Sequence, residues 1–263
     1  MQTIIISAII TSVVGILIGL FLGIFGEKFK VETDEREEAV RNALPGNNCG
    51  GCGYAGCDAL AKAIVVGEAP TNACPVGQAK VANEISKIMG VESVNATKKV
   101  AFVKCQGDCN VAKINYNYVG IKDCRIVKTL PNEGAKGCNY GCLGYGTCKS
   151  VCEFGAIEII NGVAVIDKEK CTACGKCKSV CPRHLIEIVP YDKTIRVACN
   201  SHDKGKDVKS VCATGCIGCT LCTKQCEADA ISVDNFLAHI DYDKCVECGK
   251  CMEKCPSKII KKF

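Results

Sequence analysis

Tryptophan is absent from this chain of 263 residues, aromatic residues make up only 5%, and three histidines occur. No GxGxxG segment opens a strand–turn–helix unit and no Walker loop is present, so the sequence has neither a dinucleotide fingerprint nor a phosphate-binding loop. His184, His202 and His239 are scattered along the chain and are interpreted as surface or packing residues. We therefore predict no catalytic residue and exclude hydride and phosphoryl chemistry on this chain.

Cysteine is abundant instead, at 25 of the 263 residues. Such a density is typical either of a disulfide scaffold in a secreted protein or of metal ligation in a reducing compartment. Repeated CxxC steps gather thiolates around one point, whereas disulfides need separated, well-directed pairs. The spacing therefore favours metal ligation, and a chain with several one-electron centres and no organic cofactor site can only receive and pass on electrons.

One cysteine pattern is written twice, 74 positions apart and without insertion or deletion. The first copy is Cys142, Cys148, Cys152, Cys171, Cys174, Cys177 and Cys181, and the second is Cys216, Cys222, Cys226, Cys245, Cys248, Cys251 and Cys255. Each copy closes on a CxxCxxCxxxCP run, CTACGKCKSVCP or CVECGKCMEKCP, in which three cysteines hold one four-iron cluster and the fourth ligates its neighbour. The duplication predicts two tandem bacterial-type 2[4Fe-4S] ferredoxin-like domains.

The ligand sets follow from this rule. In the second unit they are Cys216, Cys219, Cys222 and Cys255 for one cluster, and Cys226, Cys245, Cys248 and Cys251 for the other. In the first unit they are Cys138, Cys142, Cys148 and Cys181, and Cys152, Cys171, Cys174 and Cys177. Tyr145 stands where the second copy has Cys219, so Cys138 is taken as the replacement ligand, and its counterpart Cys212 is then surplus.

A further four-iron site is predicted upstream, from Cys49, Cys52, Cys57 and Cys74. Glycines between these cysteines allow backbone amides to approach cluster sulfurs, and a helix is expected to begin at Cys57. Zinc is the alternative occupant of such a set. Five clusters are thus expected.

Five cysteines are left over, namely Cys105, Cys109, Cys124, Cys199 and Cys212. They either supply a sixth cluster or are small buried hydrophobes and free thiols. The sequence leaves both interpretations open.

Residues 3–26 carry no charge and, at about 1.5 Å per residue, can cross the hydrocarbon layer of a membrane. No basic segment precedes this stretch and no small-x-small cleavage site follows it, which favours a transmembrane helix over a signal peptide. Lys28 and Lys30 lie just after it, so the positive-inside rule places the rest of the chain in the cytoplasm. Thr11, Gly15, Gly19 and Gly23 share one helix face, either for packing against another helix or simply facing lipid.

The predicted fold class is α+β, with one transmembrane helix, a small helical 4Fe-4S domain and two ferredoxin-like domains. The expected boundaries are a transmembrane helix at 1–26, a charged stalk at 27–44, the N-terminal 4Fe-4S domain at 45–90, a middle segment at 91–135, the first ferredoxin-like domain at 136–190, a connector at 191–209 and the second ferredoxin-like domain at 210–263. Hairpins are expected with Asn161-Gly162 and Asp234-Asn235 at their turns.

The apolar N-terminus is followed by LPGNNCGGCGYAGC, VKCQG, GCNYGCLGYGTC, KSVCPRHLIEIVP, GCIGC and CVECGKCMEKCP. In this order, over essentially the whole chain, these segments resemble the B subunit of the Rnf family of ion-translocating oxidoreductase complexes. The resemblance implies a subunit of a translocase that links ferredoxin to NAD and moves Na⁺ or H⁺. This subunit would take electrons from reduced ferredoxin and relay them through [4Fe-4S] clusters, with no NAD or substrate-chemistry site of its own.

The same resemblance implies the partners and the location of the chain. The partners would be Rnf subunits A, C, D, E and G, with soluble ferredoxin as the electron donor. The location would be the bacterial cytoplasmic (inner) membrane, as a single-pass protein with its iron-sulfur domains on the cytoplasmic side.

Two alternatives are kept: an iron-sulfur electron-transfer subunit of another membrane oxidoreductase, and a zinc-stabilised membrane adaptor without a redox role. No nucleic-acid partner is expected, although the formal charge is +5. Each oxidised cluster with four thiolates adds about −2, so five clusters bring the folded chain to roughly −5.

Overall fold

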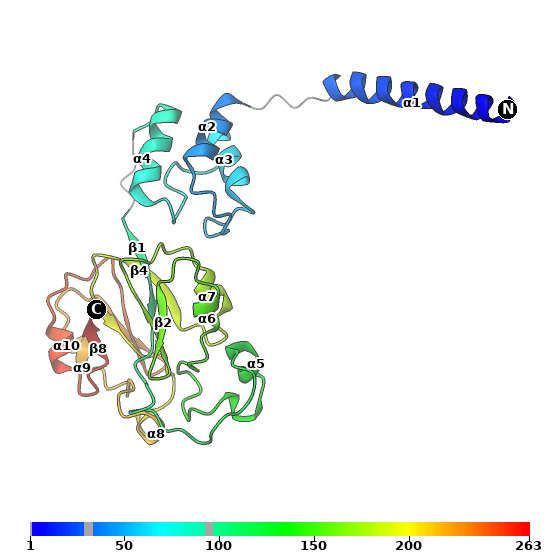
Figure 1. The fold of residues 1–263 in the computed structure, drawn as a ribbon. Coiled ribbons are helices and arrows are strands. Elements are labelled where there is room, and N and C mark those ends of the chain that lie inside the picture. Colours follow the sequence, from blue (N-terminus) through cyan, green and yellow to red (C-terminus); the bar gives the residue numbers. More distant parts are fainter. Residues whose placement is uncertain (1, 29–33, 93–96) are drawn as a thin grey trace.

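The computed structural model describes residues 2–28, 34–92 and 97–263 of the chain. Figure 1 shows an N-terminal helix, a small group of helices and a larger body of short strands and helices. The fold is thus mixed α+β, in agreement with the predicted fold class.

The N-terminal helix α1 (Gln2–Lys28) covers the apolar stretch of the sequence. Large apolar side chains along it are exposed, among them Leu17, Phe21 and Leu22. A transmembrane helix was expected here, but within the described parts of the chain no helix has both the length and the apolarity needed to cross a bilayer. Part of the predicted charged stalk, residues 29–33 with Lys30, lies outside the described residues.

Three helices form the small domain: α2 (Glu35–Ala43), α3 (Cys57–Val66) and α4 (Gln78–Met89). Helix α2 lies in the second half of the expected stalk, yet Val40 on it is fully buried against Leu60 and Ile64 of α3. Arg41 also pairs with Asp58 at 2.5 Å. Residues 35–43 therefore pack as part of the small helical domain rather than standing free in solvent, because an apolar side chain on an otherwise charged helix gains by burial.

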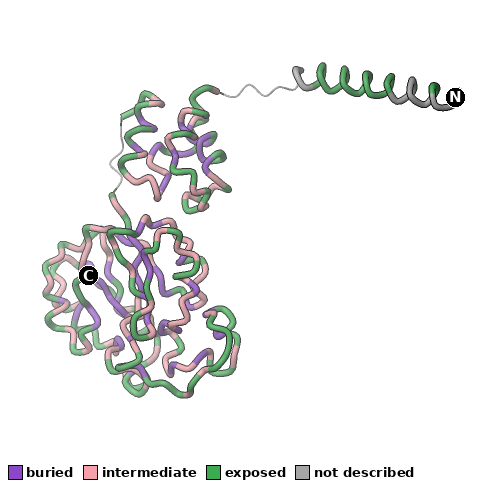
Figure 2. The backbone as a smooth tube through the Cα atoms, viewed as in Figure 1, coloured by how far each residue is buried: buried purple, intermediate pink, exposed green. Residues whose placement is uncertain are grey.

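The body repeats itself element by element at the 74-residue offset. The first copy has α6 (Thr147–Ser150), β2 (Ile157–Ile160), β3 (Val163–Ile166), α7 (Lys176–Val180) and β4 (Ile186–Pro190); the second has α9 (Leu221–Lys224), β6 (Ile231–Asp234), β7 (Leu237–Ile240), α10 (Lys250–Lys254) and β8 (Ile260–Lys262). The helices of the two copies lie on opposite sides of the central strands (Figure 1). Buried backbone runs through those strands (Figure 2).

Both predicted hairpins are present, as β2–β3 and β6–β7. The first turn is at Asn161-Gly162, but the second is at Asn235-Phe236, one residue later than expected, because Asp234 still pairs with Leu237. Asn235 and Phe236 both have positive φ, at 45° and 64°. The pairing register, with apolar side chains held inward, overrides the preference for Asp at a turn.

Segments upstream of each copy supply its remaining strand. The middle segment contributes β1 (Lys99–Val103), which pairs antiparallel with β4, and the connector contributes β5 (Ile195–Val197), which pairs with β8. Val103 lies opposite Ile186, and Val197 lies opposite the equivalent Ile260. The remaining short helices are α5 (Cys124–Lys128), η1 (Pro131–Glu133) and α8 (Gly205–Val211). The duplication thus includes the strands that precede the cysteine pattern.

Candidate iron-sulfur centres

Four cavities in the body are each lined by four cysteines. All of these cysteines are free thiols. In the described residues no three Cys, His, Asp or Glu side chains stand together closely enough to hold one metal ion. Four thiols around a space are the donor set that a [4Fe-4S] cluster uses, so the residues fit that group.

In the second unit, one cavity is lined by the four cysteines expected from the sequence: Cys216, Cys219, Cys222 and Cys255. The other predicted set is also brought together. The pKa of the Cys251 thiol is raised to about 11, first by burial and then by the nearby thiols of Cys245, Cys226 and Cys248. Buried thiols that crowd one another are protonated when metal-free and become thiolates when they bind iron.

In the first unit, one cavity is likewise lined by the expected Cys152, Cys171, Cys174 and Cys177. Burial raises the pKa of the Cys177 thiol to about 12, followed by the effects of Cys171 and Cys174. The backbone at this site has the same conformation as its counterpart in the second unit. Gly175 and Gly249 are the N-cap residues of α7 and α10, with φ values of 81° and 80°.

The second cavity of the first unit departs from the prediction. It is lined by Cys142, Cys148 and Cys181 as expected, but the fourth cysteine is Cys124 and not Cys138. Cys124 begins α5, and its backbone N–H donates to Thr147 Oγ1 at 2.7 Å, next to Cys148. The middle segment therefore supplies the thiol that is missing at Tyr145.

Tyr145 occupies a different environment. Its ring packs against Tyr118 of the middle segment, with ring centroids 5.4 Å apart, in a small apolar cluster that includes Cys124 and Val127. Replacing a cysteine by tyrosine at this position therefore helps to hold the segment that delivers Cys124. The sequence-based prediction chose Cys138, which is closer in the chain to Cys142 than Cys124 is. Cysteine spacing alone does not indicate that the segment around residue 124 folds back against this cavity.

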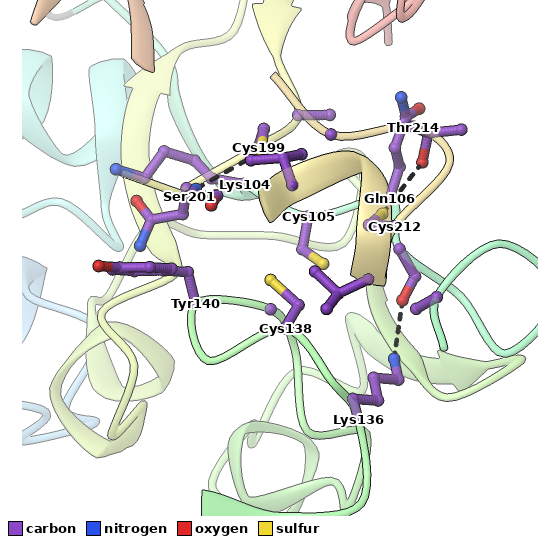
Figure 3. A pocket seen from close by; sticks show the side chains of 18 residues that line it. Lys104, Cys105, Gln106, Lys136, Cys138, Tyr140, Cys199, Ser201, Cys212 and Thr214 are labelled. Atoms are coloured by element: carbon purple, nitrogen blue, oxygen red, sulfur yellow. Dashed lines mark hydrogen bonds between the residues drawn. The ribbon is translucent and has the colours of Figure 1, made fainter. Parts of the chain in front are cut away.

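Cys138 lies instead in a cavity with Cys105, Cys199 and Cys212 (Figure 3). These include three of the five cysteines that the sequence left over. Cys138 and Cys212 are separated by the repeat offset of 74, and Cys105 and Cys199 each follow a first strand at the same register. Each unit thus contributes two cysteines to this cavity, which lies between the two copies.

The hydrogen bonds around this cavity repeat as well. The backbone N–H of Cys142 donates to Cys105 Sγ at 3.3 Å, and the N–H of the equivalent Cys216 donates to Cys199 Sγ at 3.3 Å. Backbone N–H groups directed at sulfur favour the charged thiolate form. Burial has the larger effect and raises the pKa of the Cys199 thiol to about 12.

One feature of the cavity is not duplicated. Lys136 is 5% exposed, and its ammonium donates to the carbonyl oxygens of Gly107 and Gly162 at 2.8 and 2.7 Å. Burial raises the pKa of the Cys105 thiol, and the charge of Lys136 opposes that rise. The second copy has Ser210 at this position. A buried cation therefore stands at one side of an otherwise symmetric site, where it favours negative charge on the sulfurs.

The upstream set lies in the helical domain. Burial raises the pKa of the Cys74 thiol, and the thiols of Cys57 and Cys49 add to that rise. Cys52 packs against the same apolar core. The side chain of Asn48 accepts a hydrogen bond from the Cys57 N–H at 2.8 Å, at the start of α3 as predicted.

This upstream set contacts the first ferredoxin-like unit. A Cβ added at Gly51 would lie 2.4 Å from the carbonyl oxygen of Cys174, closer than any real Cβ contact. Cys49 is also near enough to raise the pKa of Cys174. Two cysteine loops from different domains therefore meet backbone to backbone, and only glycine at position 51 allows that approach.

Cys109 is the one cysteine outside these six groups in the described chain, and it is exposed. Its backbone N–H donates to the Asn161 carbonyl oxygen at 2.9 Å.

The duplicated fold and the cavities lined by four cysteines are those of an electron-transfer protein with tandem ferredoxin-like units. Family models agree, since an Fe-S cluster model matches residues 44–76, a 4Fe-4S binding domain matches 164–187 and a 4Fe-4S dicluster domain matches 215–260.

Comparison with individual proteins narrows the class. The chain is 50% identical over 233 residues to the B subunit of the ion-translocating oxidoreductase complex of Methanosarcina acetivorans, covering 88% of both chains. It is 48% identical to the B subunit of the Na⁺-translocating ferredoxin:NAD⁺ oxidoreductase complex of Acetobacterium woodii, covering 88% of this chain and 70% of the relative. It is 41% identical over 265 residues to the B subunit of the proton-translocating complex of Clostridium ljungdahlii, covering 99% and 93%. The chain belongs to the family formed by the B subunits of ion-translocating oxidoreductase (Rnf) complexes.

Proposed function

We propose that this chain is the iron-sulfur subunit through which reduced ferredoxin delivers electrons to a membrane-bound, ion-translocating ferredoxin:NAD⁺ oxidoreductase. The relatives from A. woodii and C. ljungdahlii belong to complexes of that name. The observation that carries the proposal is the grouping of cysteines: four cavities of the body are lined by four thiols each. Such a chain has electron relay as its only evident chemistry.

We assign six [4Fe-4S] clusters, one more than the five derived from spacing. Their proposed ligands are Cys49, Cys52, Cys57 and Cys74; Cys124, Cys142, Cys148 and Cys181; Cys152, Cys171, Cys174 and Cys177; Cys105, Cys138, Cys199 and Cys212; Cys216, Cys219, Cys222 and Cys255; and Cys226, Cys245, Cys248 and Cys251. These sets use 24 of the 25 cysteines and omit Cys109.

When bound, each cluster would supply a site that accepts and releases one electron. The residues of this chain set where those sites lie and how polar they are. The approach of Gly51 to Cys174 brings the upstream site beside the first unit. The four cysteines of Figure 3 lie between the two units, where they can join them into one relay. Lys136 holds a positive charge at that junction.

We further propose that the chain works at a membrane with Rnf subunits A, C, D, E and G. The uncharged residues 3–26 support attachment to the bilayer, and the lysines that follow them support a cytoplasmic placement of the clusters. The single-pass arrangement stays a prediction from the sequence.

The test is the content of iron, acid-labile sulfide and zinc in protein purified without oxygen. Six clusters predict about 24 iron and 24 sulfide per chain, and five predict about 20 of each. Zinc in place of sulfide contradicts the proposal, as does a fully loaded protein that reduced ferredoxin does not reduce.

A further inference from the structure

The duplicated units present the same cysteine loop in two different surroundings. The loops are residues 171–177 and 245–251, and their backbones match: Ala173 and Glu247 both have φ of 56°. Each loop also contains a lysine that pairs with a glutamate, Lys176 with Glu153 and Lys250 with Glu227. Any difference in exposure between the loops therefore reflects what lies against them, not how they fold.

In the first unit the loop is covered by another part of the same chain. Gly51 of the upstream cysteine loop lies against the Cys174 carbonyl, with Pro75 beside it. Cys174 is half-buried, and the side chain of Lys176 is 27% exposed. This contact brings two four-cysteine sites together through a glycine and a carbonyl group.

In the second unit the equivalent loop is open within the described chain. Cys248 is exposed, Val246 is 70% exposed and the side chain of Lys250 is 47% exposed. A single exposed apolar side chain is common on protein surfaces, but an exposed cysteine of a proposed cluster site brings that site close to solvent. Such exposure is expected where an electron has to cross to another molecule.

We propose that residues 246–250 of the second unit form the docking surface for ferredoxin, engaged as residues 49–53 engage the first unit. The occupant is a small iron-sulfur carrier whose own cysteine loop presents a small residue to the Cys248 backbone. This inference rests on the proposed function and adds which of the two units receives the donor. The first unit is excluded because its equivalent surface is already occupied.

The charges nearby fit a contact centred on the loop. Lys250 is paired with Glu227, and Lys244 with Asp241 at 3.8 Å, while the carboxylate of Glu247 accepts hydrogen bonds from the backbone N–H groups of Thr194 and Ile195. Backbone and Val246 are left to make the closest approach. In such a contact, a charge introduced at the apolar centre costs more affinity than a charge changed at the rim.

The test compares Val246→Glu with Val119→Glu, at a valine of the middle segment that is 94% exposed. We expect Val246→Glu to lower the second-order rate constant for reduction by ferredoxin about tenfold or more, the scale of one lost anchor residue. Reduction by titanium(III) citrate and the iron content should stay unchanged, and Val119→Glu should behave as the unmodified protein in all three measurements. An unchanged rate with ferredoxin for Val246→Glu overturns the docking surface.

Amide hydrogen exchange on the unmodified protein with all its clusters tests the docking surface without a variant. This test remains valid even if Val246→Glu fails to retain iron. Oxidised ferredoxin should slow exchange within residues 246–250. Slowing only elsewhere, or slowing at 246–250 by another subunit of the complex in the absence of ferredoxin, overturns the inference. Failure of ferredoxin to reduce the unmodified chain instead contradicts the proposed function, so the two failures are distinguishable.

Discussion

Cys138 and Cys212 are 74 residues apart, at equivalent places in the two repeats, and they line one cavity together. With Cys105 and Cys199 they form a site that needs both units, because neither unit has more than two of the four cysteines. The structure therefore has a site at the junction of the two copies, in addition to the sites within each copy.

Replacing Cys124 and Cys138, separately and together, tests whether these two cysteines ligate different clusters or the same one. We expect Cys124→Ser and Cys138→Ser each to lose about four iron, and the double variant to lose about eight, because the two thiols line different cavities. Iron and sulfide analysis measures this, with Cys109→Ser as the control that loses none. A double variant that loses only four iron would mean that both cysteines serve one cluster.

Lys136 should raise the reduction potential of the site between the units. A cation beside a cluster stabilises the reduced form, which carries one more negative charge, so Lys136→Met should lower that potential by tens of millivolts. The variant also leaves the carbonyl oxygens of Gly107 and Gly162 without their donor, which costs about 1–3 kcal/mol of stability. Potentiometric titration followed by electron paramagnetic resonance measures the shift.

Lys113→Met is the matched control, because Lys113 is exposed. Its potential should equal that of the unmodified protein, since water screens an exposed charge. Equal reduction potentials for both variants would show that Lys136 does not affect the potential of this site.

Gly51→Ala should slow electron exchange between the upstream site and the first unit. The added Cβ would meet the Cys174 carbonyl oxygen at 2.4 Å, and two backbone segments would have to move apart. Stopped-flow reduction monitored at the separate clusters should show the upstream cluster reduced more slowly, at unchanged iron content. Gly53→Ala is the control in the same loop, because it strains a residue with φ of 88° but meets nothing within 4 Å. Equal slowing in both variants would point to loop strain rather than to the contact.

Gly19→Leu should release the chain from its membrane partners if the glycine face of α1 packs against another helix. A Cβ at Gly19 meets nothing within 4 Å in this chain, so the substitution should leave the chain's own fold unchanged. Bulk at a small-residue face prevents close helix approach. Co-purification in detergent measures the effect, with Ile18→Leu as the control. Retention of all partners by Gly19→Leu would favour a lipid-facing helix.

Local sequence patterns were sufficient where all four ligands of a site lie within one ferredoxin-like unit. The CxxCxxC runs place three thiols within one short loop, and the repeat offset brings Cys255 to its site as it brings Cys181. The class of protein and its cofactor type could be predicted on this basis, whereas the family was predicted from the resemblance of the ordered segments over the whole chain. The packing of the charge-rich segment at 35–43 was harder to predict, because it depends on the burial of a single residue, Val40.

The sequence by itself determined that this chain is a duplicated ferredoxin-like protein, since thiolate spacing around a cubane is a local geometric requirement. Only the tertiary structure decided that Cys124 and not Cys138 lines the cavity of the first unit, that four cysteines from two repeats meet, and that Gly51 covers one cysteine loop while its twin stays open. The physical reason is that these contacts join segments distant in the chain, and their positions depend on strand pairing and burial of the whole body.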